Sequence, residues 1–181
     1  IDQAIRISPS GERMDAVASF NTSAAAFGKQ THDHERCRSG ALGEAAALCE
    51  KRGQRLTEIR REVLALVWER HAPVGAYDIL AALSAKRGRV APPTVYRALE
   101  FLLDQGLIHR IESLNAYVGC PVPAQDHSGQ FLICRDCGAA AELSDPRIEA
   151  AIGAALSNLD FEAEKSVVEI KGLCPRCRDA A

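Results

Sequence analysis

The chain has 181 residues and a formal net charge of −2. Hydrophobic residues make up 47% of it and charged residues 25%, a globular balance that excludes a wholly disordered chain. No apolar run approaches the ~20 residues of a membrane-spanning helix or resembles a secretion signal, so we expect a cytoplasmic location and no membrane partner. In that setting the seven cysteines indicate metal binding or thiol chemistry rather than a disulfide framework.

The nearly neutral charge is an average over unlike segments. Residues 49–113 carry eleven Lys and Arg against eight Asp and Glu, whereas residues 114–181 carry six against ten. A basic middle segment is a weak indication of a polyanionic partner. Taken alone, it is equally consistent with an ordinary solvated surface.

Residues 1–43 are rich in small and polar side chains and lack a long apolar period, so we expect a largely flexible N-terminal extension. Residues 1–13 precede the single methionine, and we expect them to be upstream sequence without a functional role. His32, His34 and Cys37 lie in one short polar run, where His34 and Cys37 share a face at helical spacing. They are candidates for a third metal site, and the alternative is an exposed segment without ligands.

Four helices are predicted next, mainly from apolar residues at helical spacing and from helix-ending signals. We expect them at 44–52, from 56–58 to a break at 71–75, at about 76–86, and from 92 to a stop at 105–106. Strands at 107–111 and 116–118, joined by a turn at 113–115, then form a β-hairpin. Three helices followed by a hairpin is the order of a winged helix-turn-helix, whose last helix enters the DNA major groove.

The outward side chains of that last helix include Thr94, Tyr96 and Arg97. Arg makes bidentate contacts to guanine, and Tyr and Thr reach phosphates or thymine methyl groups. The alternative is the ordinary surface of a helical bundle, but the order of elements favours DNA binding.

The last third is predicted to be a small α+β domain. We expect strands at 131–134 and 139–143, a helix at 146–159 capped by Ser144 or Asp145, and a strand in the second half of 161–170. The boundary with the preceding domain is placed at 119–124, where two prolines stiffen the connection.

Two CxxC pairs are the strongest signal in the chain. Cys134 and Cys137 are separated from Cys174 and Cys177 by 36 residues. Four thiolates suit tetrahedral zinc, and such a closed site stabilises a fold without an open position for catalysis. The alternatives are two separate redox motifs or reduced cysteines without a metal.

A second set of possible ligands flanks the domain boundary: His109, Cys120, His127 and Glu142. Each residue alone is ordinarily a surface or core residue. A metal bound by residues from both domains would fix their relative orientation, which is what a sensor needs.

Several motifs together resemble the ferric uptake regulator family. They are QRLT at 54–57, the arginine pair at 60–61, AYD at 76–78, PTVYRAL at 93–99, and the segments 102–107 and 131–138. The resemblance covers about residues 49–177. The run PPTVYRALEFLLDQGLIHRIES followed by AYVGC is most similar to the zinc uptake regulator branch.

The resemblance implies a homodimeric repressor that binds double-stranded operator DNA when loaded with zinc and represses zinc uptake genes. It implies at least two zinc ions per subunit, a structural one at the two CxxC pairs and a regulatory one at the second ligand set. Family DNA contacts map onto Tyr77 and Arg97, with Arg55, Thr94 and Tyr96 as supporting contacts.

An α+β fold is therefore expected, with a winged helix-turn-helix followed by a small α/β dimerisation domain. The DNA-binding domain is placed at 44–119, a hinge at 120–124, and the zinc-stabilised dimerisation domain at 125–181.

Two alternatives remain. The first is an iron or peroxide sensor of the same family, but the His-His-Asp-His run of the iron branch is reduced here to Asp126-His127, and a thiolate ligand favours zinc over Fe(II). The second is a zinc hydrolase with Glu142 or Glu149 as general base, yet no HExxH motif is present. We therefore expect a regulator and not an enzyme.

Overall fold

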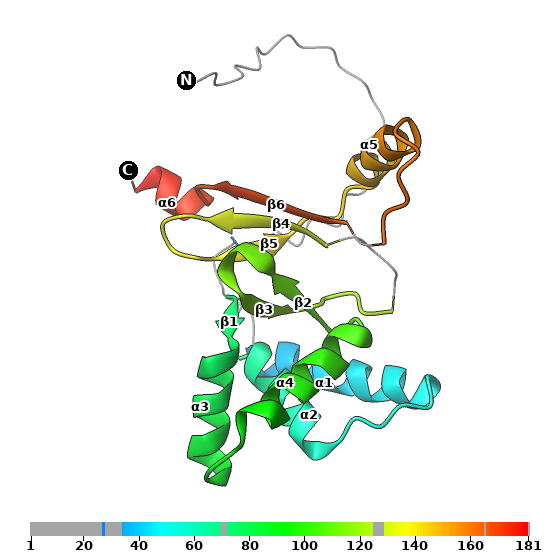
Figure 1. The fold of residues 1–181 in the computed structure, drawn as a ribbon. Coiled ribbons are helices and arrows are strands. Elements are labelled where there is room, and N and C mark those ends of the chain that lie inside the picture. Colours follow the sequence, from blue (N-terminus) through cyan, green and yellow to red (C-terminus); the bar gives the residue numbers. More distant parts are fainter. Residues whose placement is uncertain (1–26, 28–33, 70–71, 125–128, 165, 181) are drawn as a thin grey trace.

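A computed structural model describes residue 27 and residues 34–69, 72–124, 129–164 and 166–180. Figure 1 shows that the helices α1 to α4 form one layer and that the sheet of β4, β5 and β6 forms another, with a smaller sheet of β1, β2 and β3 between them. Within the described ranges, no helix is both long enough and apolar enough to cross a membrane. The predicted α+β class is confirmed.

The first helix, α1 (His34–Lys51), begins well before the predicted start at residue 44. Residues 34–43, which the prediction placed in the N-terminal extension, therefore belong to this helix, while most of the preceding segment lies outside the described residues. Ala45 and Cys49, each 1% exposed, pack α1 into the helical core. Tertiary packing of this kind stabilises a helix that its own sequence indicates only weakly.

The remaining helices of this layer are α2 (Glu58–Val67), α3 (Ala76–Arg87) and α4 (Pro92–Asp104). α2 ends at Val67, before the predicted break at 71–75. The predicted end of α3 and start of α4 hold: Gly88 follows α3 with a φ of 80°, and Pro92 occupies the first turn of α4, where its missing N–H costs nothing. Thr57 stands at the N-cap of α2, although its side chain makes no capping hydrogen bond. The side chains buried between these helices include Val63, Leu64, Val67, Ile79, Leu83, Val95, Leu99 and Leu102.

An ion-pair network joins the end of α3 to α2. The guanidinium of Arg87 donates to both oxygens of Glu62, at 2.6 and 2.9 Å, and lies 2.9 Å from Glu58. The hydrogen bond from Arg87 lowers the pKa of Glu62. The network therefore helps to fix the angle between the two helices while the carboxylates are charged.

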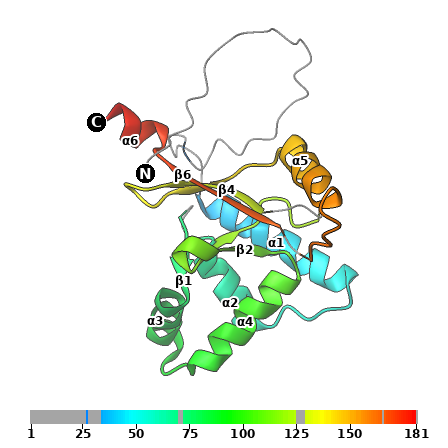
Figure 2. The same cartoon turned by 45° about the horizontal axis from the view of Figure 1, so that its top comes forward.

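The smaller sheet contains β1 (Val74–Gly75), β2 (Ile108–Ile111) and β3 (Ala116–Gly119), in the antiparallel order β1-β3-β2. The tip between β2 and β3 is a 3-10 turn, η2 (Glu112–Leu114), followed by Asn115 in the left-handed conformation with a φ of 47°. The predicted hairpin is therefore present, and Figure 2 shows it between the helical layer and the second sheet.

The second sheet contains β4 (Gly129–Cys134), β5 (Ala140–Glu142) and β6 (Val167–Gly172) in the order β5-β4-β6. Strand β4 is antiparallel to β5 and parallel to β6, and the connection to β6 contains α5 (Pro146–Ser157). A short helix that was not predicted, α6 (Pro175–Asp179), follows β6.

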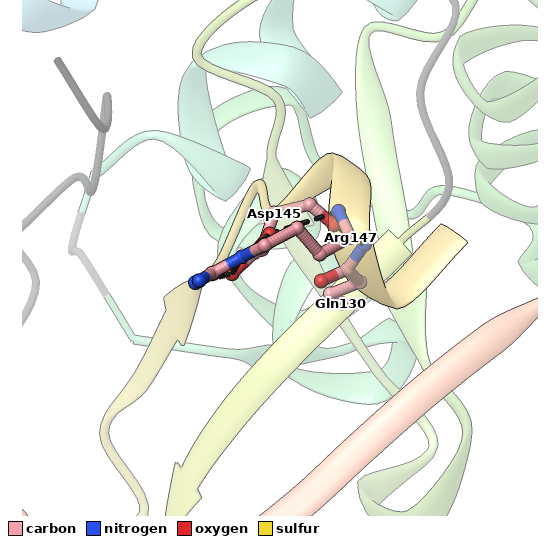
Figure 3. Close-up of polar contacts among 3 residues, drawn as sticks. All are labelled: Gln130, Asp145 and Arg147. Atoms are coloured by element: carbon pink, nitrogen blue, oxygen red, sulfur yellow. Dashed lines mark hydrogen bonds and ion pairs between the residues drawn. The ribbon is translucent and has the colours of Figure 1, made fainter. Parts of the chain in front are cut away.

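Of the two predicted caps, Ser144 and Asp145, it is Asp145 that caps the start of α5. Its carboxylate accepts a hydrogen bond from the backbone N–H of Arg147 at 2.9 Å and pairs with the guanidinium of that residue at 2.6 Å (Figure 3). The buried Gln130 donates from Nε2 to the backbone oxygen of Asp145 at 3.2 Å. These contacts anchor the start of α5 to β4.

An apolar seam joins the hairpin to the second sheet. Ile111, which is fully buried, and Val118 pack with Phe131 and Ile133 of β4 and with Val167 of β6. The hairpin thus contributes to the packing of both layers and forms their physical connection.

Candidate metal centres

The parallel pairing of β4 and β6 brings the two CxxC pairs together. Cys134, the last residue of β4, pairs in register with Gly172, the last residue of β6. Cys137 follows in the turn after β4, and Cys174 and Cys177 lie around the start of α6. Two parallel strands that end side by side therefore deliver both cysteine pairs to one edge of the sheet.

The geometry of the four sulfur atoms fits a tetrahedral zinc ion. All four lie within 4.8 Å of one another, and Sγ of Cys137 is 3.8 Å from Sγ of Cys174. Zinc–sulfur bonds of about 2.3 Å place the sulfurs of a tetrahedral site about 3.8 Å apart. The structure brings the four predicted ligands together, as a shared metal site requires.

Backbone amides and neighbouring sulfurs control the protonation of this cluster. Hydrogen bonds from the amides of Cys174, at 3.4 Å, and of Cys137 lower the pKa of Cys134 to about 6. The sulfurs of Cys174 and Cys137 raise the pKa of Cys177 to about 12. Four adjacent thiols cannot all ionise by themselves, and a divalent cation compensates the charge when all four are thiolates.

A second cluster spans the hairpin and the second sheet. It contains His109 of β2, Cys120 directly after β3, and Glu142 of β5, with one ligand atom from each within 4.8 Å of the others. Nε2 of His109 lies 3.3 Å from Oε1 of Glu142. Zinc–nitrogen and zinc–oxygen bonds of about 2.1 Å place two such atoms about 3.4 Å apart, so this cluster also fits zinc.

Surrounding contacts hold the ligands of the second cluster in place. The ring of His109 packs against that of Phe131, with centroids 5.4 Å apart. The backbone N–H of Cys120 donates to the carbonyl of Leu107 at 3.1 Å. Burial, with a smaller contribution from the carboxylate of Glu142, raises the pKa of Cys120 to about 12. The thiol is therefore protonated at neutral pH, and a bound metal must displace its proton.

Other predicted ligands are not brought into these clusters. His127 and His32 lie outside the described residues. His34 is the first residue of α1, and Cys37 is an exposed residue of the same helix. Neither of the two clusters found among the described residues contains Cys37. The third site therefore stays a prediction.

The predicted DNA contacts lie on exposed positions. Tyr77 is in the first turn of α3 and 77% exposed. Tyr96 and Arg97 are exposed on α4, and Thr94 is partly exposed there. Arg55 is exposed in the segment between α1 and α2.

Two features near the second cluster were not anticipated. The indole of Trp68 lies so close to Gly119 that a Cβ there would be 2.6 Å from Cζ2 of the ring. Glu169 of β6 reaches the tip of the hairpin. A glycine within a strand is a weak signal of close approach, whereas a single acidic residue in a strand carries none.

Comparison with known proteins agrees with this architecture. The chain is 39% identical over 137 residues to the zinc uptake regulation protein of Escherichia coli (strain K12), covering 75% of this chain and 80% of that protein. It is 25% identical over 147 residues to the peroxide-responsive repressor PerR of Staphylococcus epidermidis (strain ATCC 12228 / FDA PCI 1200), covering 81% and 93%.

Solved structures give the same result. A zinc uptake regulator complexed with zinc and DNA is 37% identical, with a TM-score of 0.76 and coverage of 79% of this chain and 96% of that one. The crystal structure of holo XcZur is 39% identical, with a TM-score of 0.71 and coverage of 82% and 100%. Residues 51–171 match the ferric uptake regulator family. This chain belongs to the ferric uptake regulator family.

Proposed function

We propose that this chain is a zinc-responsive transcriptional repressor that binds operator DNA as a zinc-loaded dimer and represses zinc uptake genes. The observation that carries the proposal is the cluster of His109, Cys120 and Glu142, whose ligand atoms come from the hairpin and from the second sheet. The similarity of the chain to zinc uptake regulators, one of them in complex with zinc and DNA, supports the same function.

Two zinc ions per subunit are part of the proposal. The four cysteines hold a structural ion, because a closed tetrahedral thiolate site contributes to folding and leaves no open position. The three-ligand cluster, completed by His127, holds a regulatory ion. A thiolate and an imidazole are ligands that favour zinc over Fe(II) or Mn(II).

The position of the second cluster suggests how zinc controls DNA binding. Zinc, when bound, ties the hairpin to the second sheet. Residues 120–124 act as the hinge between the DNA-binding part at 44–119 and the dimerisation part at 125–181. In a dimer, the two α4 helices must reach successive major grooves about 34–36 Å apart, so the hinge angle decides whether both fit. Metal and DNA then strengthen each other's binding by the same factor.

Exposed side chains indicate the two partners of this arrangement. Tyr77 and Arg97 contact operator DNA, with Arg55, Thr94 and Tyr96 in support. The second partner is indicated by three exposed apolar side chains, two just after α5 and one in β6: Leu159, Phe161 and Ile170, which are 74%, 62% and 46% exposed. Burial of such apolar side chains favours association with a second copy of the chain.

A DNA-binding regulator of this kind acts in the cytoplasm.

Neither alternative has comparable support. A peroxide or iron sensor is less favoured because the PerR sequence is 25% identical, against 39% for the zinc regulator. A hydrolase would need a general base beside an open metal position. Glu142 belongs to the ligand cluster and Glu149 is exposed on α5, so the chain is not an enzyme on this proposal.

Operator titrations at controlled free metal test the function. Zinc is expected to raise operator affinity at lower free concentrations than Fe(II), and Cys120→Ser is expected to abolish this response while leaving a folded dimer with its structural zinc. Cys49→Ala is the cysteine control, since Cys49 is packed in the helical core and lies outside both clusters. Equal operator affinity with and without the second zinc would refute the proposal.

A further inference from the structure

The tip of the β2–β3 hairpin is capped by a side chain from the second sheet. Glu169 accepts a hydrogen bond from the backbone N–H of Glu112 at 2.6 Å and from that of Ser113 at 3.1 Å. These residues open the 3-10 turn η2, whose first N–H groups have no acceptor within the turn itself. Their acceptor comes from β6, a strand more than fifty residues later in the sequence.

The contact is made by a charged carboxylate. Burial opposes ionisation, but hydrogen bonds from the Ser113 side chain and from the amides of Glu112 and Ser113 outweigh it and lower the pKa of Glu169. Hydrogen bonds to a charged acceptor are about twice as strong as neutral ones. The side chain of Glu112 is engaged separately by Arg110, at 3.1 Å, which braces the tip from within the hairpin.

This contact and the second metal cluster hold the same strand. His109 lies three residues before Glu112, which is about 10 Å along an extended strand. Between them Ile111 packs in the apolar seam with Val167, which shares a face of β6 with Glu169 because the two are two residues apart. One metal centre alone leaves rotation about itself possible, whereas a second attachment about 10 Å away opposes that rotation.

We propose that Glu169 is a positioning residue that fixes the hairpin on the second sheet and thereby sets the zinc affinity of the His109–Cys120–Glu142 cluster. The inference rests on the proposed function and deepens it. Ligands from both parts must be aligned before one ion can bind them all, so apparent zinc affinity falls with the fraction of molecules that are aligned. Glu169 raises that fraction before zinc arrives.

Zinc titration of Glu169→Gln and Glu169→Ala tests the inference. Each protein carries zinc at the four cysteines, and the second equivalent is titrated in competition with a chelator of known affinity. The glutamine variant is expected to bind the second zinc about three- to tenfold more weakly, since it loses the charge of two hydrogen bonds. The control is Glu162→Gln, which removes an exposed carboxylate shortly before β6. This variant is expected to bind the second zinc with the affinity of the wild type.

Two more measurements separate positioning from a general loss of stability. Amide hydrogen exchange at Glu112 and Ser113 is expected to accelerate in Glu169→Gln, while exchange in the helical core stays unchanged. At saturating zinc the variant is expected to bind operator DNA as the wild type does, because mass action restores the aligned state.

The outcomes distinguish this inference from the proposed function. If both Glu169 variants bind the second zinc with wild-type affinity, the inference is overturned and the proposed function stands. If the wild-type chain binds a second zinc without any change in DNA binding, the proposed function is overturned alone. If it binds no second zinc at all, both fail.

Discussion

Replacing Gly119 by alanine tests whether the packing of Trp68 supports the ligand-bearing end of β3. An added Cβ would lie under 3.0 Å from three atoms of the indole, Cε2, Nε1 and Cζ2, the farthest of which is Cζ2 at 2.6 Å. Gly119 is not among the residues with positive φ, so alanine can adopt its backbone conformation. Any cost therefore comes from displacing the indole or the strand.

The magnitude follows from overpacking. An extra methyl group in a well-packed site costs about 1–3 kcal/mol, and the reduced entropy of the unfolded chain returns about 0.4–1 kcal/mol. We expect Gly119→Ala to lower the free energy of unfolding by about 1–2 kcal/mol. The control is Gly153→Ala, because Gly153 lies within α5 with nothing within 4 Å of an added Cβ. That change is expected to stabilise by about 0.5–1 kcal/mol.

Urea unfolding of both zinc-loaded variants, followed by circular dichroism, measures these differences. Trp68 is the single tryptophan of the chain, so its fluorescence reports directly on the displaced ring. Because Cys120 is the next residue, Gly119→Ala is also expected to weaken zinc binding at the second cluster. A Gly119 variant as stable as the Gly153 variant, with unchanged fluorescence, would refute the close packing.

Three other perturbations have expected outcomes. Binding of the second zinc at pH 7 is expected to release about one proton from Cys120, whose pKa is raised to about 12, and calorimetry in buffers of different ionisation enthalpy should show this release absent in Cys120→Ser. Cys177→Ser is expected to lose chelator-resistant zinc and to lower the melting temperature, as measured by metal content after dialysis and by a thermal scan. The pKa of Glu62 is lowered in the folded chain. Its ion pair with Arg87 therefore stabilises the fold fully at pH values above the ordinary pKa of 4.5, and this stabilisation is lost as the pH falls through the lowered pKa of the folded chain. Acid unfolding of Glu62→Gln should therefore be less steep than that of the wild type.

The sequence was informative wherever a local pattern carries the structure. Apolar spacing and the Pro and Gly signals located α2, α3 and α4, and the spacing of Cys134, Cys137, Cys174 and Cys177 predicted a four-sulfur cluster. It did not predict α1 as far back as His34, because the packing of Cys49 and its neighbours, rather than local propensity, holds that helix.

Contacts between distant segments were beyond local patterns. His109, Cys120 and Glu142 were grouped because they flank a boundary and match a family, since nothing in their spacing requires them to meet. The contact of Trp68 with Gly119 depends on how the end of α2 packs against β3, and that of Glu169 with the hairpin tip depends on how the two sheets pack. Only the fold specifies either.

The hairpin that follows the DNA-binding helices is held by the second sheet. Ile111 is buried in the seam, and the tip at Glu112 and Ser113 is held by Glu169. Its two strands also frame a metal cluster through His109 and Cys120. Only three residues separate the end of α4 from the start of β2. A shift of the hairpin on the second sheet therefore moves α4 relative to that sheet. On the proposed function, the hairpin is therefore the element through which zinc binding sets the position of α4.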